Sequence, residues 1–240
     1  MYMPLMIDIK KCVVFAGERE EGLQKTEKMA VFADELLVVP EDESAPSSIR
    51  LEAGPLDRVP ESLSLKEVRE IPVADKPATA ENIGTYIEGA TFVTSDLEDR
   101  ALNQMVADEC EQRNILCNII DVKELCNTWL MSVIDTPNMI AGLSTKGGCA
   151  FYAQRTRIEM EEEFENRSEI SRIFTELRGE TTENQCNLCA LDEVYHREEI
   201  QHLIEGEQWE ETLTQGRSYL AELPDEFCVK DHSVKAVNHA

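Results

Sequence analysis

VVFAGEREEGLQK, from Val13 to Lys25, is the stretch that decides the fold of the first half of this 240-residue chain. A continuous apolar run ends at Gly17, and a segment of helical composition follows at once. Dinucleotide-binding proteins place the fingerprint G-x-G-x-x-G between such a strand and such a helix, because its glycines allow a tight turn and let the pyrophosphate approach the backbone. Here only Gly17 and Gly22 are glycines, and acidic residues fill most of the turn. The stretch predicts a strand and a helix, and it leaves open whether the turn binds a nucleotide.

A parallel sheet is predicted around this stretch. A second apolar run at 36–39 follows after one helix length, and two more lie at 90–94 and 115–120 with an amphipathic helix at 101–113 between them. Strands that are apolar without alternation are typical of a sheet covered by helices on both faces. We therefore expect an α/β protein whose Rossmann-like, NAD-binding-type domain spans residues 1–113.

Three further regions are predicted. Residues 41–76 are rich in proline, serine and acidic residues, which favours a loop-rich insertion with an edge strand. Two short strands joined by the turn Asp135–Asn138 fall in a central segment, residues 114–150. From 151 to 240 the pattern is helical, so we expect a helical C-terminal domain.

Composition excludes two classes of partner. The chain has 23 basic and 48 acidic residues, a net charge of −25. Such a chain repels nucleic acid and anionic membrane surfaces. No stretch approaches the roughly 18 apolar residues of a membrane span, and the N-terminus lacks the basic start and the cleavage site of a signal peptide. We expect a cytoplasmic protein.

The cysteines offer one candidate metal motif. Eight cysteines are too few and too irregular for a secreted disulfide framework. Cys186 and Cys189 have a metal-ligand spacing, with His196 and His202 downstream, but the histidine gaps fit no usual zinc finger. The alternative, thiols that pack between helices, is favoured, and we expect no metal site.

Several motifs carry a resemblance to a known family. The segments LNQMV at 102–106, NILCNIID at 114–121, SVID at 132–135 and STKGGC at 144–149 follow one another without a gap in the family's order. The opening VVFAGEREEGLQK lies over the family's VVGGGxVAxRK, with Gly17 on its first glycine and Lys25 on its lysine. The chain resembles the siroheme synthase N-terminal family, the precorrin-2 dehydrogenases and sirohydrochlorin ferrochelatases.

The resemblance implies a fold and an activity. It implies a homodimer with an NAD-binding Rossmann domain, a swapped central β segment that serves dimerisation, and a helical C-terminal domain. It also implies oxidation of precorrin-2 to sirohydrochlorin with NAD and, in some members, insertion of ferrous iron as a substrate to make siroheme. The substrate carries eight carboxylates.

Asp121 is the candidate catalytic residue. It follows an apolar strand, where open α/β sheets place their ligands, and the resemblance gives its position a role in both reactions. A carboxylate beside the macrocycle is suited to accept the protons that either reaction releases. The alternative from the residues alone is a helix N-cap, since Lys123-Glu124-Leu125 follow at once.

Basic residues around the Gly-Gly turn are the candidate substrate ligands, because a chain of net charge −25 must gather positive charge locally to bind a polyanion. The alternative is a solvated helix face with i,i+4 ion pairs. On the following helix Phe151, Ala153 and Ile158 are expected to face inward, with the arginines on the other side. The candidate substrate ligands are Ser144, Thr145, Lys146, Arg155 and Arg157.

The nucleotide site is the weakest motif. Glu18, Glu20 and Glu21 place carboxylates at the helix end that should attract phosphate, so they would satisfy the helix dipole internally and leave no room for an anion. The family's T-D-D motif is also replaced, by Leu97, Glu98 and Asp99. If NAD binds, the expected contacts are Gly17, Glu20, Glu21, Val39, Pro40 and Glu41.

Three functions therefore stay open. The first is a precorrin-2 dehydrogenase, with or without ferrochelatase activity. The second is a relative that has lost NAD and acts as a tetrapyrrole-binding or chelatase-only protein, or as a non-catalytic pathway partner. The third is an acidic Rossmann-like dimer with no tetrapyrrole role.

Overall fold

The fold was analysed in a computed structural model, which describes residues 7–17, 20–55, 63–146, 148–181 and 187–224. Two compact units make up the chain, residues 1–135 with 141–158, and residues 136–140 with 159–240.

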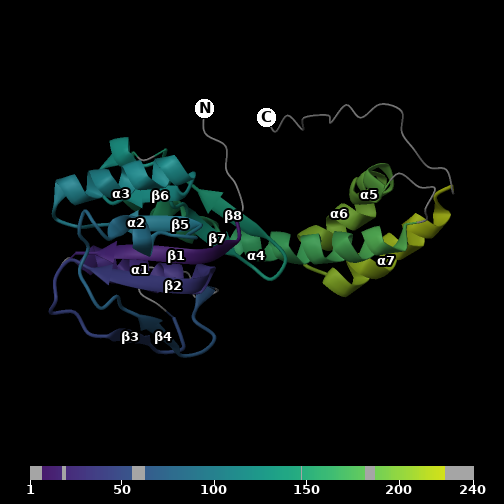
Figure 1. The fold of residues 1–240 in the computed structure, drawn as a ribbon. Coiled ribbons are helices and arrows are strands. Elements are labelled where there is room, and N and C mark those ends of the chain that lie inside the picture. Colours follow the sequence, from purple (N-terminus) through teal and green to yellow (C-terminus); the bar gives the residue numbers. More distant parts are fainter. Residues whose placement is uncertain (1–6, 18–19, 56–62, 147, 182–186, 225–240) are drawn as a thin grey trace. The chain divides into compact units, whose positions relative to one another are not determined.

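A four-stranded parallel sheet is the centre of the first unit (Figure 1). Its strands are β1 (Ile9–Ala16), β2 (Ala33–Pro40), β5 (Phe92–Ser95) and β6 (Leu116–Ile119), in the order β2-β1-β5-β6. All three neighbouring pairs are parallel. The sequence prediction of a Rossmann-like parallel sheet is confirmed.

Helices cover both faces of this sheet. Side chains alternate along a strand, so Val13 and Phe15 of β1 pack with the cluster around α3 (Arg100–Arg113), and their neighbours Cys12 and Val14 pack with α1 (Glu20–Phe32). Because both faces are buried, every position of β1 from 12 to 15 must be apolar. This explains the continuous runs in the sequence.

The described part of the insertion contains more strand than the sequence predicts. It forms two antiparallel strands, β3 (Ser48–Leu51) and β4 (Arg69–Pro72), where one edge strand was expected. The Arg69 guanidinium donates hydrogen bonds to the Ala30 carbonyl in the last turn of α1 and to the Ala33 and Asp34 carbonyls at the start of β2. The last carbonyls of a helix lack partners within the helix, so this arginine fastens the insertion to α1. The short helix α2 (Ile83–Tyr86) follows.

The central segment forms a 3₁₀ turn, η2 (Lys123–Leu125), and a two-stranded sheet of β7 (Ser132–Asp135) and β8 (Ile140–Leu143). The long helix α4 (Ala150–Glu180) begins after it and continues into the second unit.

The expected faces of α4 are wrong for most positions. Phe151 is 74% exposed and Ile158 is 47% exposed, whereas Arg157 is only 6% exposed. Of the residues expected to face inward, only Ala153 is buried. Helical periodicity gives the spacing of a face, but it does not say which face meets the neighbouring elements.

The second unit is helical, as predicted. After α4 come α5 (Asn187–Tyr195), α6 (Glu198–Glu205) and α7 (Trp209–Glu222). His196 and Arg197 lie between α5 and α6, outside both helices. A core of small and aliphatic side chains holds the unit together: Ile173, Leu177, Ala190, Val194, Ile200, Leu213 and Leu220.

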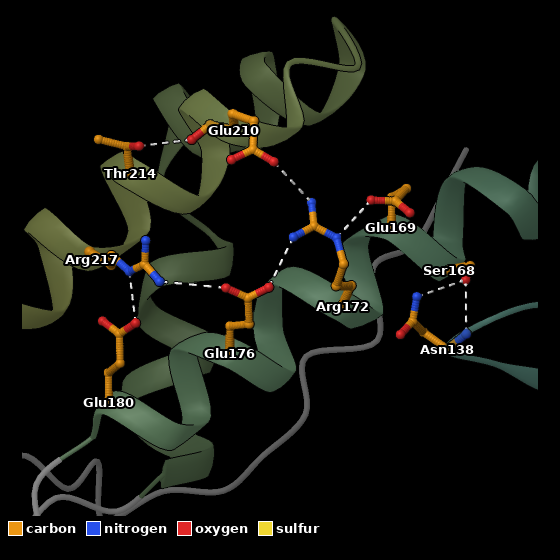
Figure 2. A network of polar contacts seen from close by, with 9 residues as sticks. All are labelled: Asn138, Ser168, Glu169, Arg172, Glu176, Glu180, Glu210, Thr214 and Arg217. Carbon is orange, nitrogen blue, oxygen red and sulfur yellow. Dashed lines mark hydrogen bonds and ion pairs between the residues drawn. The ribbon is translucent and has the colours of Figure 1, made fainter.

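Ion pairs join α4 to α7 on the surface of the second unit (Figure 2). Arg217 of α7 contacts Glu180 of α4 at 2.7 Å and Glu176 of α4 at 3.5 Å. Arg172 of α4 contacts Glu210 of α7 at 3.5 Å. Such partly exposed pairs contribute little individually, about 0–1 kcal/mol. None of the helices in the described ranges combines the length and apolar character that a membrane span requires.

Candidate functional site

The strand order places a topological switch point between β1 and β5. From β1 the chain passes through α1 to β2 on one side, and it later returns to β5 on the other side. Ligands of open α/β proteins bind in the crevice at the carboxyl ends of the strands at such a point. Gly17 follows β1 and Asp96 follows β5, so these two residues flank the crevice.

A carboxylate lies in this crevice. Asp96 is only 3% exposed, and its Oδ1 accepts a hydrogen bond of 2.7 Å from the backbone N–H of Gly17. A Cβ atom on Gly22 would lie 2.9 Å from each oxygen of the same carboxylate. The Asp96 carboxylate therefore lies between the two glycines, at the N-terminal end of α1, where free N–H groups and the helix dipole favour an anion.

Gly17 is required by the protein's own packing. A Cβ at this position would lie 2.7 Å from the Asp96 carbonyl oxygen and 2.9 Å from Oε2 of Glu41. No other residue fits without moving the backbone after β5. The first glycine of the fingerprint thus brings the ends of β1 and β5 together, whether or not a ligand is bound.

Glu41 follows β2, at the position from which an acidic side chain holds a ribose hydroxyl in many dinucleotide sites. Its Oε1 accepts hydrogen bonds from the N–H groups of Glu98 (2.8 Å) and Asp99 (3.3 Å). Within the part of the chain that the structure describes, its buried Oε2 has no hydrogen-bond partner. Glu41 is therefore held partly by the loop that precedes α3.

The other expected nucleotide contacts are less accessible. Val39 is fully buried in the core on the α3 side of the sheet, and Pro40 is also buried. Glu20 and Glu21 begin α1, but their side chains lie outside the described part of the structure, as do Glu18 and Arg19.

An apolar hollow of about 290 Å³ borders Gly17 on the α1 side. Side chains from the ends of β1 and β2, from α1 and from the insertion line it, among them Leu23, Val38, Pro46 and Ile49. Its size and lining suit a flat apolar ring better than a charged group.

Asp121 lies on a second part of the crevice edge, just after β6. Its side chain is exposed, and its backbone has a positive φ of 60°, which is uncommon for a residue other than glycine. The N-cap of η2 is Val122, without a side-chain capping bond, so Asp121 does not cap that turn. The structure therefore does not support the capping alternative.

Lys25 of α1 lies near Asp121, and Lys28 follows three residues later on the same helix. Burial lowers the pKa of Lys25, and the charges of Asp121, Cys126 and Asp96 oppose this shift. Burial, followed by the positive charges of Lys25 and Arg157, lowers the pKa of Lys28 to about 8. The Lys28 ammonium donates to the Met131 carbonyl at 3.3 Å. Among the described residues, Lys25 makes no hydrogen bond or ion pair.

Lys25, Lys28 and Arg157 form what we call the cationic cluster. The charge of Arg157 lowers the pKa of Lys28, so Arg157 of α4 lies close to Lys28 of α1. Sequence reasoning selected Arg157 but missed both lysines as ligands, although their i,i+3 spacing on a predicted helix places them on one face. In a chain with 23 basic and 48 acidic residues, two lysines on one helix face could have been recognised as candidate ligands of an anionic substrate.

The loop before α4, residues 144–146, lies beside the turn that carries Asp121. Lys123, two residues after Asp121, donates from Nζ to the Lys146 carbonyl at 3.3 Å. The hydroxyls of Ser144 and Thr145 accept hydrogen bonds from the N–H groups of Lys146 and Cys149, so they shape the loop.

The structure thus brings the Ser144–Lys146 loop to the turn that carries Asp121 and places Arg157 in the cationic cluster. Arg155 is exposed on α4.

The candidate cysteine motif gains no support. Cys186 lies outside the described residues, and Cys189 is buried in α5. In the described ranges no three histidine, cysteine, aspartate or glutamate side chains are grouped as metal ligands.

Comparison with known proteins places the chain in a family. A family model described as "Putative NAD(P)-binding" matches residues 5–132, more than half of the chain. The chain belongs to this family. The curated relatives that match the chain are siroheme synthases.

Curated siroheme synthases match parts of the chain. The proteins of Psychrobacter sp. and Methylobacillus flagellatus are 32% identical over 76 residues and 30% identical over 100 residues, covering 32% and 41% of this chain. The Buchnera aphidicola protein is 21% identical over 211 residues, 85% of this chain. The matches span 16%, 20% and 41% of the length of these three relatives.

A solved structure titled "SirC, precorrin-2 dehydrogenase" has the same fold. It superposes with a TM-score of 0.54 and 15% identity, covering 92% of this chain and 98% of the other. At this identity the likeness establishes the fold alone.

The family's nucleotide does not fit the observed crevice in the usual manner. The Gly17 N–H that would meet a phosphate already binds the Asp96 carboxylate. A pyrophosphate there would also add negative charge beside Asp96 and Glu41, which Coulomb repulsion in a partly buried site opposes.

We predict that Lys28 makes stability depend on pH. Between pH 8 and 10.5 the folded chain loses the Lys28 proton while the unfolded chain still holds it, so the free energy of unfolding rises with pH in this window. Urea unfolding at several pH values should therefore show wild type gaining stability relative to Lys28→Met from about pH 8 upward. A difference between the two proteins that does not change with pH would contradict the prediction.

Proposed function

We propose that this chain binds a carboxylate-rich tetrapyrrole of siroheme synthesis, precorrin-2 or sirohydrochlorin, beside Asp121. The cationic cluster carries the proposal. A chain with a net charge of −25 holds two lysines and one arginine together, and it keeps the lysines desolvated enough to lower their pKa. Bound carboxylates would offset that cost, because charge-assisted hydrogen bonds are stronger away from water.

Metal insertion into sirohydrochlorin is the activity that the geometry supports best. In this reaction a divalent metal ion, a substrate such as ferrous iron, replaces two pyrrole N–H protons. The exposed Asp121 carboxylate accepts these protons in turn and passes them to water. The reaction needs no nucleotide, which agrees with the carboxylate of Asp96 at the N-terminus of α1.

Oxidation of precorrin-2 with NAD is the second candidate. The apolar hollow beside Gly17 favours it, because it offers room for a flat ring next to the fingerprint turn. Membership of a family described as NAD(P)-binding also favours it. The two activities differ in their co-substrates, so they are separable by experiment.

A homodimer is part of the proposal. Three apolar side chains on the first turns of α4 are exposed, Phe151 at 74%, Tyr152 at 62% and Ile158 at 47%. Large apolar side chains grouped on one helix are typical of a protein interface. A second copy of the chain is the partner that the family resemblance favours.

Substrate binding is expected to depend on the cationic cluster. Lys25→Gln and Lys28→Gln should each weaken sirohydrochlorin binding about ten-fold or more, because a hydrogen bond to a charged group contributes about 1.5–3 kcal/mol. The exposed Lys76→Gln, which removes the same charge, serves as control. Titration of the tetrapyrrole absorption bands measures the affinity, and equal affinities for all four proteins would refute the assignment.

Asp121→Asn is expected to abolish metal insertion while it preserves sirohydrochlorin binding, because the amide cannot accept the pyrrole protons. Asp75→Asn, an exposed residue of the same unit, should keep full activity. Reactions are followed with sirohydrochlorin and Fe²⁺ or Co²⁺, and separately with precorrin-2 and NAD⁺. Full activity of Asp121→Asn would remove Asp121 from the mechanism, and turnover only with precorrin-2 and NAD⁺ would favour the second candidate.

Dimerisation is expected to depend on Phe151. Phe151→Ser should raise the dimer dissociation constant at least ten-fold, since buried aromatic anchors contribute about 2 kcal/mol or more to interfaces. Leu188 is 76% exposed, close to the 74% of Phe151, so Leu188→Ser is a matched control. Sedimentation equilibrium distinguishes the two, and an unchanged constant for Phe151→Ser would exclude this face from the interface.

A further inference from the structure

We infer that Asp96 is the residue that decides nucleotide binding in this chain, because its carboxylate holds the place of a dinucleotide's pyrophosphate. This inference is independent of the tetrapyrrole proposal, since it concerns only the crevice between β1 and β5. It makes Asp96 a specificity-determining residue, and it identifies an adenine dinucleotide as the ligand that is kept out.

The position of the carboxylate is the first support. In a Rossmann-type crevice the pyrophosphate accepts hydrogen bonds from backbone N–H groups at the glycine turn and the start of the first helix. Here the carboxylate of Asp96 accepts the Gly17 N–H at 2.7 Å and lies against Gly22 in the first turn of α1. An internal anion thus meets the same donor that a phosphate would need.

The rigidity of this arrangement is the second support. The Asp96 N–H donates to the Phe15 carbonyl at 3.0 Å, so the backbone of Asp96 is fixed to the end of β1. The side chain is 3% exposed and is enclosed between Gly17 and Gly22. A phosphate would have to displace a buried carboxylate that has little room to rotate.

Charge is the third support. Oε2 of Glu41 would lie 2.9 Å from a Cβ on Gly17, and this buried oxygen has no hydrogen-bond partner among residues that the structure describes. Two carboxylates therefore border the place where two phosphate charges would lie. Repulsion between like charges at such distances is strong where water is scarce.

Removal of the Asp96 carboxylate should open the site. The Gly17 N–H and the N-terminal end of α1 would then be free to bind phosphate, and the apolar hollow of about 290 Å³ beside Gly17 would be available to the base. The structure thus assigns the loss of nucleotide binding to one side chain, with the rest of the crevice retained.

Isothermal titration with NAD⁺ tests the inference on wild type, Asp96→Ala and Asp96→Asn. Asp96→Ala removes both charge and bulk, while Asp96→Asn removes the charge and keeps the shape, so it serves if the alanine variant does not fold. Wild type should show no heat at millimolar NAD⁺. Each folded variant should bind NAD⁺ at least ten-fold more tightly, a gain of about 1.4 kcal/mol or more. Glu98→Gln, an exposed carboxylate on the neighbouring loop, should behave as wild type.

Two results would overturn the inference. Wild type that binds NAD⁺ as tightly as the Asp96 variants would show that the carboxylate does not exclude it. Folded Asp96 variants that still fail to bind would show that another feature excludes the nucleotide. Sirohydrochlorin binding is measured on the same proteins, so a failure of the tetrapyrrole proposal is seen separately.

Discussion

One hydrogen bond, from the Gly17 N–H to the Asp96 carboxylate, ties together the two strands that flank the switch point of the sheet. It explains why position 17 must be glycine and why Gly22 stands in the first turn of α1, since a Cβ at either position would meet Asp96 or its neighbours. It also fixes the electrostatics of the crevice, because the positive end of α1 is already matched by a negative charge. The retained glycines therefore do not by themselves indicate a bound nucleotide.

The same helix carries the opposite charge one to two turns later. Lys25 and Lys28 follow the N-terminal turn of α1, where Lys25 lies near Asp121 and Lys28 lies near Arg157. Asp96 contributes to the field at Lys25 as well, which links the crevice to the cationic cluster. Burial of these positive charges costs free energy, and an anionic ligand would offset it in addition to Asp121 and Asp96. The start of α1 is thus occupied by the Asp96 carboxylate, whereas the body of the helix presents positive charge to an anionic ligand.

Features that leave a local sequence pattern could be predicted, whereas features that depend on tertiary contacts could not. The parallel sheet could be predicted from continuous apolar runs such as 12–15, because a strand that is buried on both faces needs an apolar residue at every position. The pairing of β3 with β4 could not be read from residues 41–76, where proline and acidic residues dominate and the strands are short. The exposed Phe151 and buried Arg157 were assigned to the wrong faces, because periodicity does not choose a neighbour. Negative charge at the start of α1 was expected from the glutamates of the turn, Glu18, Glu20 and Glu21. The carboxylate that binds the Gly17 N–H belongs instead to Asp96, which follows β5 and lies 79 positions from Gly17, so the turn alone could not identify it.

The Gly17 amide proton tests the central claim most directly, and its nuclear magnetic resonance signal can be followed while NAD⁺ is added. The account predicts that this resonance in wild type does not move at millimolar NAD⁺, because the Asp96 carboxylate keeps its hydrogen bond. In Asp96→Ala, which removes the acceptor, the resonance should shift on addition of NAD⁺, as phosphate reaches the amide. A wild-type Gly17 signal that shifts and saturates with NAD⁺ would contradict the account.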